Sequence, residues 1–235
     1  HVDGRQLLHR LVEPDLETQR RQLVHGLLVV QLRAQSIHLL TVTSFRPTPH
    51  AMPTSEPRFV WCDLEMTGLD TNTNVIIEMG LIVTGPDLKP IAEWECAIWQ
   101  PNEALDRMEP FVKDMHTKNG LLERVRKSDI SIRQAEKEAT RQLLQHVEYG
   151  EGILAGNSIH TDRAFITRYM PGFDRALHYR MVDVSSLKVI TRAWYPNAPR
   201  RSKVDATHTV LSDLRASIGE LAYYQQTFFK KPSEV

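Results

Sequence analysis

The sequence predicts an α/β domain built on a mixed β-sheet, and two observations support this prediction. Residues 59–99 contain three runs rich in Val, Ile and aromatic residues, separated by Gly and Asn residues typical of turns. Residues 132–221 then alternate between helical and strand-like patterns, which favours parallel strands joined by helices. A meander followed by such an alternation predicts a sheet of mixed strand direction covered by helices.

Each expected element follows from its local pattern. The expected strands are Phe59–Glu65, Val75–Thr84, Glu93–Trp99, Gly152–Ala155 and Met181–Val184. The expected helices are Ile132–Val147, Thr161–Tyr169, a segment from Ser185 or Ser186 to Tyr195, and a last one beginning near Thr209. In the first of these helices apolar residues recur at steps of three and four. Prolines after the second and third helices predict where those helices end.

The composition excludes several classes of protein. The chain has 235 residues, of which 41% are hydrophobic and 25% charged, as in a globular protein. Its 29 Lys and Arg balance its 29 Asp and Glu, which argues against a broad basic surface for long nucleic acid. Two cysteines cannot form a disulfide framework and indicate a reducing compartment. No apolar stretch approaches the roughly 20 residues of a membrane helix, so we expect no membrane association.

The first 57 residues differ from the rest and are expected to lie outside the folded domain. They contain six Arg, five acidic residues and no Lys, and four prolines among residues 46–57 predict a linker. We therefore expect a folded domain over residues 58–230 and a short tail over 231–235. Arg without Lys fits a mitochondrial targeting segment, but the acidic residues argue against it. The alternative is a non-native extension, with Met52 as the true start.

Two carboxylates at the end of the first expected strand are candidate metal ligands. Asp63 and Glu65 are two residues apart, so their side chains point to the same face of a strand. Neighbouring carboxylates repel each other unless a cation lies between them, and oxygen ligands suit Mg²⁺ or Mn²⁺. Taken alone, an Asp-x-Glu sequence also fits an ordinary solvated turn.

Three further residues acquire meaning only through their order along the chain. Asp162 opens an expected helix, where an acid also complements the helix dipole. Asp213 lies in the first turns of the last helix, off its apolar stripe, where a solvated position is the alternative. His208 precedes Asp213 by five residues, at the entrance of that helix. Taken singly, each of the three fits a structural or solvated role.

The complete ordered set resembles the DEDDh exonucleases, which carry Asp-x-Glu on the first strand, a central Asp and a final His-x₄-Asp. Within that group the chain is similar to oligoribonuclease. The segments that carry the resemblance are FVWCDLEMTGL (59–69), GNSIHTD (156–162), YMP (169–171), HYRMVDVS (178–185) and His208 to Tyr224. The resemblance covers residues 58–229 and implies an RNase H-like fold, with a mixed five-stranded sheet flanked by helices.

The resemblance also implies the chemistry of the site. Two Mg²⁺ or Mn²⁺ ions, about 4 Å apart, would hold the scissile phosphate between them. The ligands implied are Asp63, Glu65, Asp162 and Asp213, of which Asp63 and Asp213 lie closest to the metals in the family. His208, which titrates near neutral pH, would accept the proton of the attacking water.

The resemblance further implies a small closed pocket for a dinucleotide. Its residues would be Leu69 as a wedge between bases, Phe111 as a stacking ring, Ser158, Arg180 and Ser185 around the 5′ phosphate, and His116 and Tyr179 from a dimer partner. Phe111 stands where the family usually has Trp, so base stacking is expected to lose part of its roughly 1–3 kcal/mol. Without the resemblance, a core or solvated role fits each of these residues.

The resulting prediction is a metal-dependent 3′→5′ exoribonuclease that hydrolyses short single-stranded oligoribonucleotides, notably dinucleotides, to mononucleotides. We expect a homodimer located in the cytoplasm or mitochondria. One alternative is a proofreading-type DNA exonuclease, although residues 66–69 and 179–180 resemble the RNA enzyme better. The other is a catalytically silent nucleic-acid-binding protein of the same fold, against which five intact catalytic positions argue.

A few other polar residues are expected to have structural roles. Glu78 and Asp183 interrupt apolar strands and are expected to stabilise them, and Cys62 and Cys96 are expected to be free thiols. The basic loop over residues 200–203 is expected to be solvated, with steering of an anionic substrate as the alternative.

Overall fold

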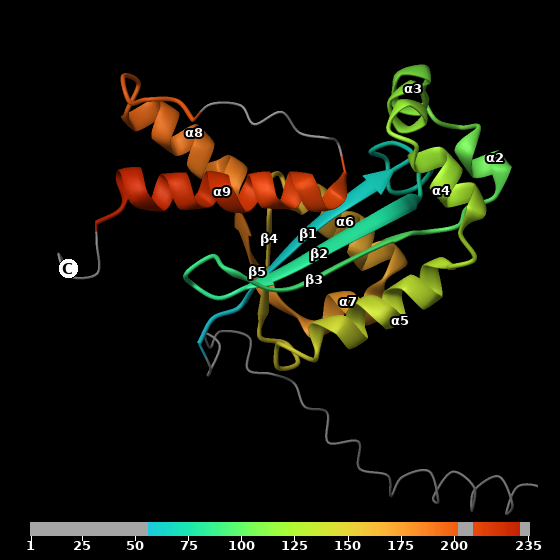
Figure 1. Cartoon of the computed structure of the whole chain (residues 1–235), viewed down its shortest axis with the longest axis horizontal. Coiled ribbons are helices and arrows are strands. Elements are labelled where there is room, and N and C mark those ends of the chain that lie inside the picture. The colour runs from blue at the N-terminus through green and yellow to red at the C-terminus, as the bar shows by residue number, and fades with distance from the viewer. Residues whose placement is uncertain (1–55, 202–208, 231–235) are drawn as a thin grey trace, which may run out of the picture. The chain divides into compact units, whose positions relative to one another are not determined.

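The computed structural model describes residues 56–201 and 209–230, which form a five-stranded sheet with helices on both faces (Figure 1). The strands are β1 (Phe59–Met66), β2 (Ile76–Thr84), β3 (Pro90–Ala97), β4 (Gly152–Gly156) and β5 (Leu177–Asp183). Their order is β3-β2-β1-β4-β5, with β1–β2 and β2–β3 antiparallel and β1–β4 and β4–β5 parallel. The expected mixed sheet is therefore confirmed, with β1 at its centre.

The helices lie in three groups around the sheet. They are α2 (Asn102–Leu105), α3 (Pro110–Lys118), α4 (Leu121–Lys127), α5 (Ile132–Leu143), α6 (His160–Tyr169), α7 (Pro171–Ala176), α8 (Val184–Trp194) and α9 (Val210–Phe228). Helices α8 and α9 cover one face and α5, α6 and α7 cover the other, while α2–α4 lie beyond the ends of β1 and β2 (Figure 1).

The structure contains elements that the sequence pattern did not predict. Helices α2, α3 and α4 are too short to display a clear helical period, and they are stabilised by packing on β2 through Ile77. Helix α6 ends at Tyr169, as the proline at position 171 predicted, but Pro171 also begins the unpredicted helix α7. Proline is tolerated as the first residue of a helix because the backbone N–H of that residue has no partner within the helix. Strand β5 begins at Leu177, four residues before the expected start at Met181.

The alternation of β1 divides its side chains between two cores. Val60, Cys62 and Leu64 belong to the core on the α5–α7 face. Trp61 belongs to the core under α8 and α9, and its indole nitrogen donates a hydrogen bond to the Thr84 hydroxyl at 3.0 Å. Since side chains two residues apart share a face, the β1 residues that follow Trp61 at this spacing point toward α9.

A glycine in β2 allows α9 to lie directly on the sheet. Gly80 pairs with Asp63 across the β1–β2 ladder. A Cβ atom on Gly80 would lie 2.8 Å from Val210 Cγ2, closer than side-chain atoms normally approach. The absence of a side chain therefore brings the first turn of α9 against the sheet, opposite the acidic end of β1.

The two cysteines match a sequence-based expectation. Cys62 and Cys96 are both free and buried, as expected for thiols within a sheet. Within the described part of the chain, no helix is both long enough and apolar enough to cross a bilayer.

Candidate active site

Three carboxylates from two elements converge at the carboxyl end of β1. Asp63 and Glu65 extend from β1 and Asp213 from the first turn of α9. One oxygen of each lies within 4.8 Å of the others. Hard oxygen donors at this spacing are the ligands that Mg²⁺ and Mn²⁺ prefer. The predicted grouping of these residues is thus present in the fold.

Asp213 lies at the border of the buried face of α9. Helical spacing alone had suggested a solvated position for this residue. The neighbours Val210 and Ser217 are both buried, together with Leu214. The buried face of α9 is therefore wider than the stripe of leucine and isoleucine residues visible in the sequence. This width turns Asp213 toward β1.

Asp162 lies beside the three carboxylates, on the first turn of α6. One of its oxygens accepts a hydrogen bond from the backbone nitrogen of Leu64 at 3.0 Å, and its side chain is 7% exposed. Its negative charge is close enough to raise the pKa of Asp63. Leu64 lies between Asp63 and Glu65 in the sequence, so its hydrogen bond to Asp162 anchors a fourth carboxylate next to the two acids of β1.

The pKa values record how tightly the carboxylates are grouped. Burial, reinforced by the charges of Asp162 and Glu65, raises the pKa of Asp63 from 3.8 to about 8. Burial, reinforced by Glu78 and Asp213, raises the pKa of Glu65 from 4.5 to about 7. The pKa of Asp162 also rises to about 7, because of burial, against the opposing effect of its hydrogen bond to Leu64.

This donor set fits divalent cations. Buried carboxylates near one another are unstable as a group of anions, and either protons or cations must offset their charge. Because the pKa values of Asp63 and Glu65 are raised, bound protons offset part of this negative charge at neutral pH. A divalent cation would offset the same charge more effectively, so the residues suit a metal centre.

Glu78 modifies this site from the adjacent strand, a role that sequence reasoning missed. It pairs with Glu65 across the β1–β2 ladder and is 1% exposed. Arg124 on α4 donates a hydrogen bond to its carboxylate, which agrees with the expected structural role. The charge of Glu78 also raises the pKa of Glu65, while Arg124 lowers it. The signal in the sequence was a lone acid within the apolar run 76–83.

His116 lies next to Glu65 in the same chain. Its side chain is fully buried, with Nε2 3.3 Å from the Met66 carbonyl oxygen and 3.8 Å from Glu65 Oε2. Burial lowers its pKa, against a smaller opposing effect of the Met66 carbonyl. This placement differs from the expectation that His116 acts from a dimer partner, because α3 packs the ring over the end of β1.

His208, the expected general base, lies outside the described residues. The described chain resumes at Thr209, whose side chain and backbone form a capping box with Ser212 at the start of α9. The role of His208 as general base therefore stays a prediction from the sequence.

Two of the residues expected around a 5′ phosphate lie together. The hydroxyls of Ser158 and Ser185 are 3.2 Å apart, although 27 residues separate them. Asp183 accepts hydrogen bonds from the backbone nitrogens of both serines at 2.9 Å. Ser158 has a φ of +53°, an uncommon conformation for a residue with a side chain. Asp183 therefore holds the β4–α6 turn against the start of α8.

Asn157 connects this pair of serines to α9. Its side-chain oxygen accepts a hydrogen bond from the Ser185 hydroxyl at 3.1 Å. Its side-chain nitrogen donates to the Ser217 hydroxyl at 2.9 Å and to Glu220 at 3.3 Å. In the sequence Asn157 stands out only as part of the segment 156–162, since nothing local predicts a partner 60 residues away.

The other expected substrate residues are exposed on elements near the carboxylates or at the sheet edge. Leu69 and Phe111 are 75% and 77% exposed, one after β1 and the other at the start of α3. Tyr179 and Arg180 are exposed on the edge strand β5, where the guanidinium of Arg180 lies 5.3 Å from the centre of the Tyr179 ring. Exposed apolar side chains of this size are available to contact a ligand.

The exonuclease family (RNase T) matches residues 60–221, which include all the described carboxylates of the site. The chain is 44% identical over 179 residues to the mitochondrial oligoribonuclease of Homo sapiens, covering 74% of each chain. It is 43% identical over 180 residues to the oligoribonuclease of Vibrio campbellii, covering 76% of this chain and 99% of the relative. The chain belongs to the oligoribonuclease family. Membership in the oligoribonuclease family confirms the resemblance read from the sequence and identifies a metal-dependent 3′→5′ exonuclease.

Solved structures agree with the fold. Exonuclease I from Escherichia coli in complex with a dT13 oligonucleotide matches with a TM-score of 0.56 at 14% identity. Exonuclease I from Methylocaldum szegediense matches with a TM-score of 0.56 at 16% identity. Each match covers 73% of this chain but only 41% of the exonuclease I chain. At such low identity these matches support the RNase H-like fold of this chain and no further property.

Proposed function

We propose that this protein hydrolyses short single-stranded oligoribonucleotides from the 3′ end, with dinucleotides as preferred substrates and mononucleotides as products. The convergence of the Asp63, Glu65 and Asp213 carboxylates carries the proposal, because it provides a divalent-metal site within the matched family domain. The curated relatives named oligoribonuclease support the substrate class.

Four carboxylates would hold two Mg²⁺ or Mn²⁺ ions. Asp63, Glu65 and Asp213 would contribute the oxygens that already lie within 4.8 Å of each other. Asp162 would complete the set with the oxygen that Leu64 does not bind. Bound cations supply positive charge that offsets the scissile phosphate and the leaving 3′ oxygen. The protein's own part is to bind and orient these groups and, through His208, to accept the proton of the attacking water.

The 5′ end of a dinucleotide would lie at the serine pair. The hydroxyls of Ser158 and Ser185 are 3.2 Å apart. Arg180, on the edge strand β5, would supply the positive charge that binds the phosphate. Leu69 and Phe111 would contact the bases with their exposed side chains. His116, buried beside Glu65, would act within its own chain as a neighbour of the metal site, and Tyr179 would reach the site of a partner subunit.

A homodimer would cover exposed apolar side chains on β5 and α8. Tyr179 and Met181 on edge strand β5 are 49% and 40% exposed, and Trp194 on α8 is 72% exposed. Unpaired edge strands with apolar side chains are liable to associate with another chain. Trp194→Glu should therefore convert the dimer to a monomer in analytical ultracentrifugation, and a wild-type chain that sediments as a monomer would contradict this part of the proposal.

The central experiment is hydrolysis of a 5′-phosphorylated diribonucleotide by the full chain with Mg²⁺. We expect rapid conversion to mononucleotides, complete loss with a chelator and recovery on adding Mg²⁺. A deoxyribonucleotide dimer tests the DNA exonuclease alternative, and the absence of any hydrolysis would favour a silent binding protein.

The phosphate end requires a second comparison. Arg180→Ala should remove the preference for a 5′-phosphorylated over a 5′-hydroxyl dinucleotide and leave slow cleavage of longer oligomers largely unchanged. Arg168→Ala is the matched control, because Arg168 is an exposed arginine on α6. An unchanged preference in Arg180→Ala would remove this residue from the phosphate site.

A cytoplasmic or mitochondrial location is consistent with the relatives. The human, bovine and mouse proteins are named mitochondrial, and the bacterial ones carry no such designation. Fractionation of cells expressing the full chain would distinguish the two locations.

A further inference from the structure

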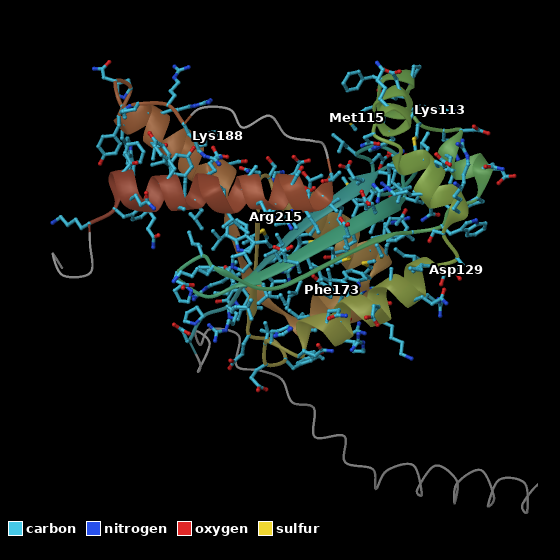
Figure 2. The ribbon with its side chains drawn as sticks, in the orientation of Figure 1. Lys113, Met115, Asp129, Phe173, Lys188 and Arg215 are labelled. Carbon is cyan, nitrogen blue, oxygen red and sulfur yellow. The ribbon has the colours of Figure 1, made fainter. Side chains whose placement is uncertain are left out.

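A separate cavity lies between α8 and the C-terminal half of α9. It has a volume of about 410 Å³, within the range of small-molecule sites. Its wall includes the charged residues Lys188, Arg192, Arg200, Arg201 and Glu220 and four aromatic residues from the end of α8 and from α9. Figure 2 shows Lys188 on α8 beside α9. Glu220 follows Asp213 by seven residues, so this α8–α9 cavity begins about 10 Å along the helix axis from the metal ligands.

The wall of the α8–α9 cavity is strongly cationic. It contains one lysine, three arginines and a single carboxylate, a net charge of +3. The carboxylate, Glu220, is already bound by Lys188 at 3.0 Å and by the Tyr224 hydroxyl at 2.8 Å. Across residues 56–201 and 209–230, no carboxylate lies within ion-pair distance of Arg192 or Arg200. Two guanidinium groups at the cavity therefore have charge that an anionic ligand would offset.

Another part of the wall is aromatic. The ring centres of Tyr195 and Phe228 lie 5.0 Å apart, and that of Tyr223 lies 6.1 Å from Phe228 in an edge-on arrangement. Tyr195 is 48% exposed, so part of its ring remains open to a ligand. Aromatic side chains of this kind favour planar rings, because stacking buries apolar area without demanding particular hydrogen bonds.

We propose that the α8–α9 cavity binds a nucleoside 5′-monophosphate, with the phosphate on Arg192 and Arg200 and the base against Tyr195 and Phe228. Inorganic phosphate would leave the aromatic wall uncovered, and a neutral aromatic compound would leave the guanidinium charges unpaired. A nucleotide satisfies both parts of the wall at once. The nucleotide can come from two sources, as a free mononucleotide or as the terminal nucleotide of a longer RNA.

Photolabelling with 8-azido-AMP tests the proposal on the full chain with Mg²⁺. An excess of a non-hydrolysable phosphorothioate dinucleotide keeps the catalytic site filled. We expect the label, mapped by mass spectrometry, on peptides that contain Tyr195 or Phe228. The double variant Arg192→Ala/Arg200→Ala should reduce this labelling by at least about tenfold, since two charge-assisted contacts are removed.

The matched control is Lys137→Ala/Arg175→Ala, which removes two exposed cations on α5 and α7, on the other face of the sheet. The control should label as the wild type does. Both double variants should retain dinucleotide hydrolysis and their circular dichroism spectrum, since all four side chains are exposed. Because labelling does not depend on hydrolysis, failure of the proposed exoribonuclease function and failure of this second site give different results.

Competitors identify the source of the nucleotide. Suppression of labelling by AMP alone indicates a site for free mononucleotide, and equal suppression by a non-hydrolysable 5′-phosphorylated ten-residue RNA indicates the terminal nucleotide of RNA. Labelling that is unaffected by the Arg192→Ala/Arg200→Ala change, or suppression by adenosine as strong as that by AMP, would overturn the proposal. Absence of label from α8, α9 and their connection would overturn it as well.

Discussion

Asp63 combines burial with four acidic neighbours, and its chemistry depends on what offsets their negative charge. In Asp63→Asn one ionisable carboxyl is lost from the group, so cation binding weakens, while the metal-free protein no longer bears the cost of ionising this buried group. We expect dinucleotide hydrolysis to fall by at least about 10²-fold. The melting temperature measured in a chelator should hold or rise.

Asp129→Asn is the control for this change. Asp129 is an exposed acid between α4 and α5 (Figure 2), so its replacement should leave turnover and melting temperature nearly unchanged. Normal turnover in Asp63→Asn would remove Asp63 from the catalytic set. Equivalent losses are expected for Glu65→Gln, Asp162→Asn and Asp213→Asn.

The raised pKa values predict an unusual pH dependence of stability without metal. Asp63 titrates near pH 8 and Glu65 and Asp162 near pH 7 in the folded protein, whereas in an unfolded chain they would titrate near pH 4. The folded state therefore binds more protons between these values, and its stability decreases as pH rises. In a chelator, the melting temperature should fall by about 5 °C or more between pH 5 and pH 8.

Saturating Mg²⁺ should reduce this decline, because cations replace the protons. Calorimetry in buffers of different ionisation enthalpy should then detect proton release on Mg²⁺ binding at pH 7. A melting temperature independent of pH in the chelator, for wild type and Asp63→Asn alike, would contradict the assignment of raised pKa values to this cluster.

His208 carries a prediction that is kinetic and not structural. If it accepts the proton of the attacking water, His208→Ala should lower turnover by about 10²–10⁴-fold. Dinucleotide affinity, measured with a non-hydrolysable analogue, should change little, since the imidazole acts on water. Added imidazole or a higher pH should recover part of the rate. A loss of affinity as large as the loss of rate would exclude the general-base role.

At the scale of elements, the position of α9 relative to β2 decides whether Asp213 reaches Asp63. Gly80→Ala would place a Cβ atom 2.8 Å from Val210 Cγ2 and 2.9 Å from Val210 Cβ, so the first turn of α9 must move. We expect a destabilisation of about 1–3 kcal/mol and a weaker Mg²⁺ affinity, because Asp213 moves with the helix.

A second substitution distinguishes this steric effect from a general loss of strand stability. Val210→Gly removes both Val210 atoms that the new Cβ atom would meet, so Gly80→Ala/Val210→Gly should regain Mg²⁺ affinity and activity relative to Gly80→Ala. Gly85→Ala is a control in the same region, since its Cβ atom would meet side-chain ends no closer than 3.2 Å. Failure of the double variant to recover would mean that Gly80 does not position α9.

At the scale of the whole molecule, charge predicts a preference for short substrates. Residues 58–235 contain 23 basic and 24 acidic residues, a net charge of −1, and only four of the cations line the α8–α9 cavity. We expect two- to five-residue RNA to be cleaved faster than a 30-residue RNA. Dinucleotide binding should weaken with salt by a slope of about one phosphate contact. Equal rates on both lengths, or a slope of several contacts, would indicate a general exonuclease.

The sequence by itself determined the sheet class, the ordered set of acids and the family. Alternation along β1 predicts which side chains share a face, and the motifs spanning residues 58–229 predict the family that the comparisons confirm. These features are local or sequential, so a single chain displays them. The apolar residues Ala135, Ala139 and Leu143 recur at helical spacing, and they form the buried face of α5.

Only the tertiary structure decided how these parts meet. The short helices α2–α4 exist because they pack on Ile77, and the burial of His116 beside Glu65 follows from that packing. The link from Ser185 through Asn157 to α9 joins residues far apart in the chain, and the α8–α9 cavity combines residues of two helices and their connection. Contacts between distant segments depend on the three-dimensional register of packed elements, which propensity and periodicity do not encode.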